Sequence, residues 1–187
     1  KNGSWWETNP QRALSNNSAA YTEKPEMGTF MREWLSLYDS KSGERGIFSR
    51  VASQNQAKKF GRRDPDHDFG TNPCSEIILR PNQFCNLTEV VVRGTDGVID
   101  LQRKVRLAAR LGTLQSTLTK FPYLRKVWTN NTEEERLLGV SMTGIMDNTL
   151  TNGKDKNIDL KHMLESLRDI AVAANKEFAE ALGIPQS

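Results

Sequence analysis

Three stretches of the chain repeat hydrophobic residues with the period of an amphipathic helix. Between residues 27 and 38 the apolar side chains fall at i, i+3, i+4, i+7, i+8 and i+11. The same kind of spacing runs from Asp100 to about residue 119 and from residue 159 to residue 182, where Gly183 follows. We expect the apolar face of each helix, including the aromatic stripe of residues 27–38, to belong to the core.

Shorter apolar runs lie between these helices. Residues 18–22 predict a short strand, and the β-branched run 90–92 predicts a buried strand because turn residues follow at 94–97. Residues 137–146 are apolar with two glycines and fit either a strand or a helix.

Two less regular segments are also predicted to be helical. Residues 46–59 form one helix, which Gly61 is suited to end. The acidic run 133–135 marks the start of another, where its charges suit the helix dipole. Helices therefore alternate with strands, which predicts an α/β fold with parallel strand pairing.

Composition excludes two classes of function. The 187 residues have a mean hydropathy of −0.62 and no run of apolar residues long enough to span a membrane. The net charge of +3 is too small to indicate direct nucleic-acid binding. Two cysteines and the lack of an apolar signal sequence at residues 1–7 predict a reducing, cytoplasmic location.

Two charged clusters favour solvated loops over binding sites. The basic residues between 58 and 63 have binding of a phosphorylated ligand as their alternative interpretation. Asp64, Asp66, His67 and Asp68 offer metal donors, but their spacing fits no calcium or zinc signature. We expect no metal site.

The strongest chemical signal is the segment 72–76. Pro73 favours an extended backbone, in which side chains alternate, so Asn72, Cys74 and Glu76 are predicted to point to one side. A reversal around residues 80–82 would then bring the second cysteine, Cys85, near the first. An amide, a thiol and a carboxylate in a row suit radical or redox chemistry.

Two plainer interpretations of the cysteines stay open. A lone buried cysteine is usually a small hydrophobic residue. The other interpretation is that Cys74 and Cys85 form a thiol–disulfide pair of their own, although the Cys-x-x-Cys spacing typical of such proteins is absent.

Around these residues the sequence resembles a known family. Residues 70–79 (GTNPCSEIIL) and 84–90 (FCNLTEV) closely resemble the active-site finger loop of ribonucleotide reductases, above all the adenosylcobalamin-dependent class II branch with its monomeric triphosphate reductases. The resemblance extends to residues 12–18 (RALSNNS), 42–48 (SGERGIF) and 135–144 (ERLLGVSMTG). It follows the order of the chain.

The resemblance implies a fold. Members of this family form a ten-stranded α/β barrel with the finger loop threaded through its middle. Residues 1–187 are expected to be one segment of that barrel, incomplete at both ends, with the finger loop at about 70–88. Residues 137–146 would then be a barrel strand.

The resemblance also implies roles for single residues. The residue matching Cys74 carries a thiyl radical that abstracts the 3′ hydrogen of the substrate ribose. The residue matching Glu76 is the general base at the 3′-hydroxyl, and the one matching Asn72 holds the substrate. The residue matching Cys85 is one of two cysteines oxidised to a disulfide in each turnover.

The implied partners follow from that reaction. The substrate is a ribonucleoside triphosphate, the cofactor is adenosylcobalamin, and thioredoxin or a similar dithiol is the reductant. The redox partner of Cys85, the cysteine pair that takes electrons from thioredoxin and the phosphate-binding loop are missing from this chain. Other segments of the same reductase are therefore expected as partners, and the chain alone is expected to be inactive.

The sequence departs from the family pattern at Ser75, and it allows one alternative to an enzyme segment. Ser75 stands where class II enzymes usually carry glycine, and a serine in an extended loop needs no positive φ, so activity is expected to survive. The alternative to an enzyme segment is a non-catalytic assembly or binding module of a split reductase. Cys74→Ser separates them, because only the enzyme would lose turnover.

Overall fold

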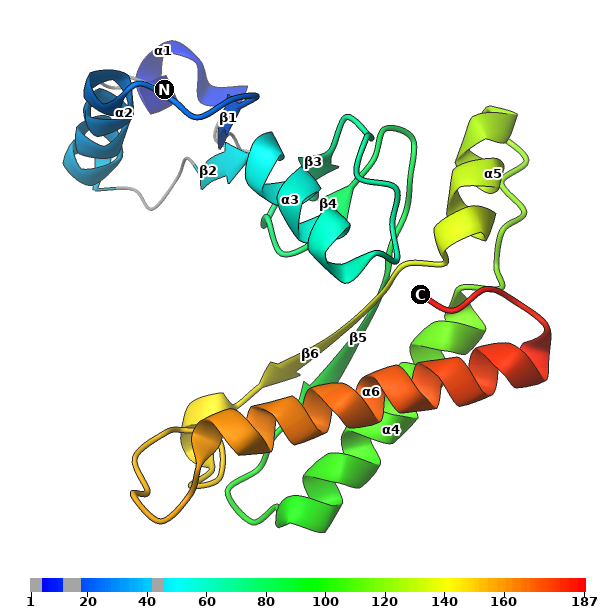
Figure 1. Ribbon diagram of the computed structural model, residues 1–187. Helices are drawn as coiled ribbons and strands as arrows, with labels where there is room; N and C mark the ends of the chain where they lie inside the picture. The colour runs from blue at the N-terminus through cyan, green and yellow to red at the C-terminus, as the bar shows by residue number, and fades with distance from the viewer. Residues whose placement is uncertain (1–4, 12–17, 42–45) are drawn as a thin grey trace. The chain divides into compact units, whose positions relative to one another are not determined.

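The computed structural model describes residues 5–11, 18–41 and 46–187. They belong to two compact units, Lys1–Pro81 and Asn82–Ser187 (Figure 1). Most of the family-like segment 12–18 and the first half of 42–48 lie outside the described residues.

The first unit contains a small parallel sheet followed directly by a helix. Strand β1 (Ser18–Tyr21) pairs with β2 (Gly46–Ser49), and helix α3 (Arg50–Phe60) starts at the next residue. The Ser49 side chain caps this helix, and Gly61 ends it with a φ of 65°. The predicted strand at 18–22 is confirmed. The predicted helix over 46–59 is wrong for its first four residues, because these pair with a strand far back in the sequence.

Helix α2 (Met27–Ser40) confirms the helix predicted at residues 27–38. It is preceded by the short helix α1 (Trp5–Thr8). The Glu26 carboxylate accepts hydrogen bonds from the Gly28 and Thr29 N–H groups at 2.7 and 2.8 Å. These bonds lower the pKa of Glu26, because they stabilise its ionised form.

The apolar face of α2 is not buried, contrary to the prediction. None of the helix residues is buried, and Trp34 keeps 51% of its surface exposed. The Phe30 ring lies 6.4 Å from the ring of Trp34 in the same helix and 6.4 Å from the ring of Tyr21 in β1, so this face makes only limited tertiary contact. The period of a helix reports which residues share a face, and only tertiary contacts decide whether that face is covered.

The second unit is built on a parallel strand pair. Strands β5 (Asn86–Val91) and β6 (Leu138–Thr143) pair along their whole length. Helix α4 (Val98–Gln115) packs on both strands and against the long helix α6 (Leu160–Leu182) (Figure 1). The ambiguous segment 137–146 is therefore mainly a strand, and the predicted parallel pairing is confirmed.

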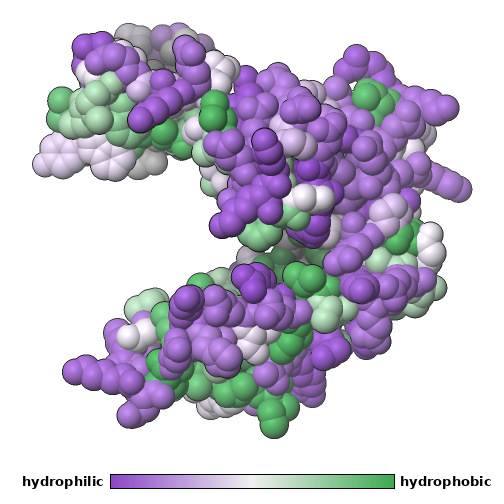
Figure 2. All heavy atoms as spheres, in the orientation of Figure 1, coloured by the Kyte–Doolittle hydropathy of each residue, from purple (hydrophilic) through white to green (hydrophobic). Residues whose placement is uncertain are grey.

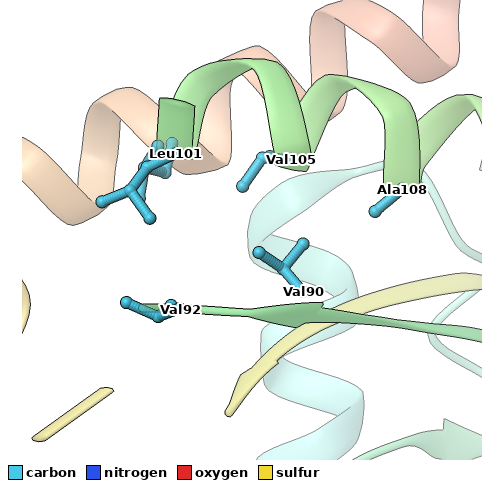
Figure 3. Packing of buried hydrophobic residues seen from close by; sticks show 6 residues of the cluster. Val90, Val92, Leu101, Val105 and Ala108 are labelled. Atoms are coloured by element: carbon cyan, nitrogen blue, oxygen red, sulfur yellow. The ribbon is translucent and has the colours of Figure 1, made fainter. Parts of the chain in front are cut away.

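The core of this unit lies between the strand pair and the two helices. Figure 3 shows the valines of the strand segment lying beneath three side chains of α4. The α4 positions are spaced by three or four residues, so they share one helix face. The buried cluster consists of Val90, Val92, Leu101, Val105, Ala108 and Leu167.

Two predicted helix starts are corrected. Helix α4 begins earlier than Asp100: Gly97 is its N-cap, and the Asp100 side chain accepts from the Gly97 N–H at 3.0 Å. The acidic run 133–135 lies at the end of helix α5 (Lys126–Glu135), where it opposes the dipole. A hydrogen bond from the Thr119 hydroxyl to Glu133 at 2.7 Å compensates for this placement.

The described residues form three two-stranded sheets, namely β1–β2, β5–β6 and the hairpin discussed below. No closed barrel is formed among them. The α/β character and parallel pairing of the predicted fold are thus present, whereas the ten-stranded barrel is not seen.

The face of the protein drawn in Figure 2 is predominantly polar. Figure 2 shows polar side chains over most of the face in view, with hydrophobic side chains exposed among them. In the part of the chain that the structure describes, no helix is both long and apolar enough to cross a membrane.

A hydrogen-bonded turn connects β5 to α4. The Asp96 carboxylate accepts from the Arg93 N–H at 2.8 Å and from the Lys104 ammonium at 2.6 Å. Lys104 also donates to the Val91 carbonyl oxygen at 2.9 Å. The buried Asn148 amide donates to the carbonyl oxygens of Arg93 and Asp96 at 2.7 and 2.8 Å, which locks the turn from the other side. The Lys104 bond, followed by the Arg93 bond, holds the pKa of Asp96 below its ordinary value.

This turn predicts a pH dependence of stability. Because its native pKa is lowered, Asp96 stabilises the fold above the unfolded pKa of about 3.9, and this contribution is lost as pH falls through the native pKa. Between about pH 5 and pH 2 we expect the free energy of unfolding to fall less steeply in Asp96→Asn than in the wild type. Urea denaturation across this range measures both slopes, and equal slopes would contradict the prediction.

Candidate active site

The first predicted motif lies in a β-hairpin of the first unit. Strands β3 (Gly70–Thr71) and β4 (Ile78–Leu79) pair antiparallel. In the loop between them, the Ser75 N–H donates to the Asn72 carbonyl oxygen at 3.0 Å, which closes a four-residue turn. The prediction of an extended segment with alternating side chains is therefore wrong.

The residue types explain this turn. Asparagine is favoured at the first position of a β-turn and proline at the second, where Asn72 and Pro73 stand. Ser75, at the fourth position, has a φ of 66°, which lies in the left-handed region. A positive φ at this position favours glycine. The expectation that Ser75 needs no positive φ is thus wrong as well.

The Asn72 side chain is part of the loop's own structure. Its Oδ1 accepts from the Ile77 N–H at 3.0 Å, while the Asn72 N–H donates to the Ile77 carbonyl oxygen at 3.2 Å. The Thr71 hydroxyl donates to the Asn72 carbonyl oxygen at 2.7 Å. With Oδ1 engaged in this way, the group that Asn72 offers to a ligand is its Nδ2, a hydrogen-bond donor.

The other two predicted residues of the motif are exposed at the tip of the hairpin. Cys74 is a free, exposed thiol, and Glu76 is exposed two residues later. The structure thus places an amide donor, a thiol and a carboxylate within five consecutive residues of one hydrogen-bonded loop. All three are accessible to a molecule that approaches the tip.

Three arginines brace the base of the hairpin around Phe69, which is fully buried. The Arg50 Nε donates to the Phe69 carbonyl oxygen at 2.8 Å, and the Arg63 guanidinium lies 4.8 Å from the centre of the Phe69 ring. Arg80 contacts the His67 Nε2 at 2.7 Å, and His67 meets the Phe69 ring edge-on. The aspartates of the predicted solvated loop, Asp64, Asp66 and Asp68, are exposed as expected. The prediction is wrong for Arg63 and His67, whose roles depend on tertiary contacts.

The same loop contains the possible metal donors Asp64, Asp66, His67 and Asp68. Among the described residues, no three His, Cys, Asp or Glu side chains are grouped so that they would hold a metal ion. His67 directs its Nε2 to Arg80 instead.

Cys85 lies in the second unit, directly before β5. It is not part of a disulfide bond and is partly buried. A turn is present at residues 81–82, where the reversal was predicted, and it falls at the boundary between the two units.

The segment leading to Cys85 is held by α5, a contact that the sequence interpretation missed. Phe84 packs against Phe121 and Trp128 with ring centroids 5.0 and 4.6 Å away. Asn131 donates to the Asn82 carbonyl oxygen at 3.2 Å. The sequence shows aromatic residues at positions 84, 121 and 128, but they are too far apart along the chain for a local pattern to predict that they pack together.

Comparison with known proteins adds to this geometry. The chain is 27% identical to a protein of Lacticaseibacillus paracasei over 97% of its own length and 26% of that relative. It is 29% identical to a protein of Lactobacillus helveticus over 94% of its length and 26% of the relative. A protein of Levilactobacillus brevis is 31% identical over 83% of this chain and 21% of the relative. All three are named adenosylcobalamin-dependent ribonucleoside-triphosphate reductase.

The chain is a homologue of these reductases. The predicted resemblance to the class II ribonucleotide reductases is confirmed by matches that cover most of the chain. The chain spans about a quarter of the length of the first two relatives. No family model and no solved structure matches it.

The left-handed Ser75 leads to a stability prediction. Ser75→Gly removes the roughly 1–2 kcal/mol cost of a left-handed L-residue but adds about 0.5–1 kcal/mol of chain entropy to the unfolded state, so we expect the free energy of unfolding of the first unit to rise by about 0.5–1 kcal/mol. Ser75→Val should lower it, because a β-branched residue tolerates this conformation poorly. Chemical denaturation of the three proteins checks both signs, and a destabilised glycine variant would contradict the prediction.

Proposed function

We propose that this chain is a segment of the catalytic core of an adenosylcobalamin-dependent ribonucleoside-triphosphate reductase, which converts ribonucleoside triphosphates to 2′-deoxyribonucleoside triphosphates for DNA synthesis. One observation carries the proposal. In a homologue of these reductases, the loop that holds Asn72, Cys74 and Glu76 forms a hydrogen-bonded, exposed tip.

Cys74 begins the reaction in this proposal. Its thiol loses a hydrogen atom, and the resulting thiyl radical removes the hydrogen from the 3′ carbon of the substrate ribose. A radical at the 3′ carbon makes loss of the neighbouring 2′-hydroxyl as water feasible. When the product leaves, Cys74 has returned the hydrogen atom to the 3′ carbon.

Glu76 and Asn72 serve the same sugar. The exposed Glu76 carboxylate takes the proton of the 3′-hydroxyl as the 2′ oxygen departs. Asn72 donates from Nδ2 to the substrate, because its Oδ1 is held by the Ile77 N–H. The hairpin therefore supplies both an acceptor and an oriented donor.

Cys85 supplies reducing equivalents. Reduction of the 2′ carbon needs two electrons and two protons, which Cys85 and a second cysteine deliver as they form a disulfide. Cys74 is reserved for the radical, so the second cysteine comes from another segment of the reductase. Thioredoxin or a similar dithiol then reduces the disulfide by exchange.

Adenosylcobalamin fits this site because an exposed thiol at a loop tip is reachable by a bulky cofactor. When bound, it would supply the radical that is passed to the Cys74 thiol. The rest of the reductase would complete the ten-stranded barrel of which residues 1–187 are one segment, in the cytoplasm. That barrel would also cover the tip, because thiyl and sugar radicals must be kept from water and oxygen.

The test grafts this chain into the Lacticaseibacillus paracasei reductase in place of the matching segment. Formation of deoxyribonucleotides is measured with adenosylcobalamin and a dithiol present. We expect Cys74→Ser to reduce activity at least about a thousandfold, because hydrogen abstraction depends on the sulfur. Cys74 is exposed, so thermal stability should be unchanged. Full activity of the Cys74→Ser chimera would reject the proposed role.

Cys85→Ser is the matched control that separates hydrogen abstraction by Cys74 from reduction by Cys85. It should also abolish deoxyribonucleotide formation, but it should keep the release of tritium from the 3′ position of labelled substrate to water, which Cys74→Ser loses. Equal tritium release in the two variants would contradict the separate roles.

A further inference from the structure

We propose that Arg63 is the positioning residue of the hairpin tip: it binds the outer edge of β4 and thereby fixes the Asn72 amide donor. This inference rests on the proposed function only for what Asn72 binds. Arg63 lies outside the hairpin, between the end of α3 and Phe69.

The anchoring contact is a hydrogen bond to the backbone of β4. The Arg63 Nη1 donates to the Ile78 carbonyl oxygen at 2.8 Å. Asn72 and Ile77 form the bonded pair at the end of the hairpin, and antiparallel strands alternate bonded and non-bonded pairs. The Ile78 carbonyl oxygen therefore points away from β3, and Arg63 takes the place that a third strand would occupy.

The contact reaches the Asn72 amide along three consecutive peptide units. The Ile78 carbonyl oxygen that Arg63 binds belongs to the peptide between Ile78 and Leu79. The peptide between Ile77 and Ile78 carries both the N–H of Ile78 and the carbonyl oxygen of Ile77, which accepts from the Asn72 N–H at 3.2 Å. The Ile77 N–H, on the other side, donates to the Asn72 Oδ1 at 3.0 Å. Holding the Ile78 carbonyl oxygen thus restrains the two preceding peptide units, which make both bonds to Asn72, and Nδ2 keeps one orientation.

Arg63 is itself fixed. Its guanidinium lies over the ring of Phe69, 4.8 Å from the centroid, and Phe69 is fully buried. Arg50 in turn holds the Phe69 carbonyl oxygen at 2.8 Å. A planar guanidinium stacks on an aromatic ring and donates hydrogen bonds at the same time, which the ammonium of lysine does less well.

The alternative is that Arg63 only adds positive charge at the end of α3, and this explains its contacts less well. Lys58 and Lys59 lie in the last turn of α3, where positive charge suits the helix dipole, and need no ligand. Arg63 instead makes a directed bond to a single carbonyl oxygen that belongs to a different element.

The test uses the ¹⁵N-labelled chain and needs no catalysis, so its failure is separate from failure of the Cys74 experiment. Arg63→Met removes the donors and keeps an unbranched side chain over Phe69. We expect the Ile77 amide to exchange with solvent roughly tenfold faster, since bonds to charged groups shift local opening by about this factor. The Asn72 side-chain NH₂ resonances should move towards free-amide positions. Amides of α3 should keep their exchange rates.

Two variants serve as controls. Arg63→Lys restores a charged donor without the planar guanidinium and should recover only part of the Ile77 protection. Lys58→Met removes a positive charge from an exposed side chain in the last turn of α3 and should leave Ile77 and Asn72 unaffected. The assignment is overturned by an unchanged Ile77 rate in Arg63→Met, by an equal effect of Lys58→Met, or by equal acceleration throughout α3.

Discussion

The chemistry-bearing loop depends on one hydrogen bond, from the Ile77 N–H to the Asn72 side chain. A side-chain oxygen here replaces the backbone oxygen that would close an ordinary hairpin pair, so the loop can contain a four-residue turn and still remain attached to both strands. The bond uses half of the Asn72 amide for structure and leaves the other half for recognition. Position 72 therefore requires an amide, because aspartate would accept from Ile77 and offer no donor.

The two thiols are carried by different kinds of structure. Cys74 lies on an exposed turn held by a few local bonds, where reach matters. Cys85 is partly buried and enters a strand that packs on the core of the second unit, with Phe84 fixed on α5. In the proposed reaction this difference is useful. The radical-bearing sulfur must meet both cofactor and substrate, whereas the reducing sulfur must be held beside the 2′ carbon and a partner cysteine.

Much of this arrangement follows from local sequence, and the rest does not. The helices α2, α4 and α6 were predictable because a period near 3.6 shows within a few turns, and Asp159 and Gly183 mark the ends of the last one. Strand β2 was missed because its partner is distant. The turn at Asn72 was misread although its signal was present, since proline suits both an extended segment and the second position of a turn. The exposure of Trp34 and the role of Arg63 depend on which elements meet, which no local pattern reports.

Lys104 has a consequence beyond the turn that it stabilises. Alternate residues of β5 bond to β6, as Val92 does through its N–H, so Val91 turns its backbone to the open edge of the sheet. The Lys104 ammonium occupies the Val91 carbonyl oxygen there. A foreign strand that pairs at this end would first have to displace a charged group, which is how natural sheets discourage edge-to-edge aggregation. The Lys104 ammonium group thus disfavours incorrect strand pairing at this edge while the sheet has only two strands.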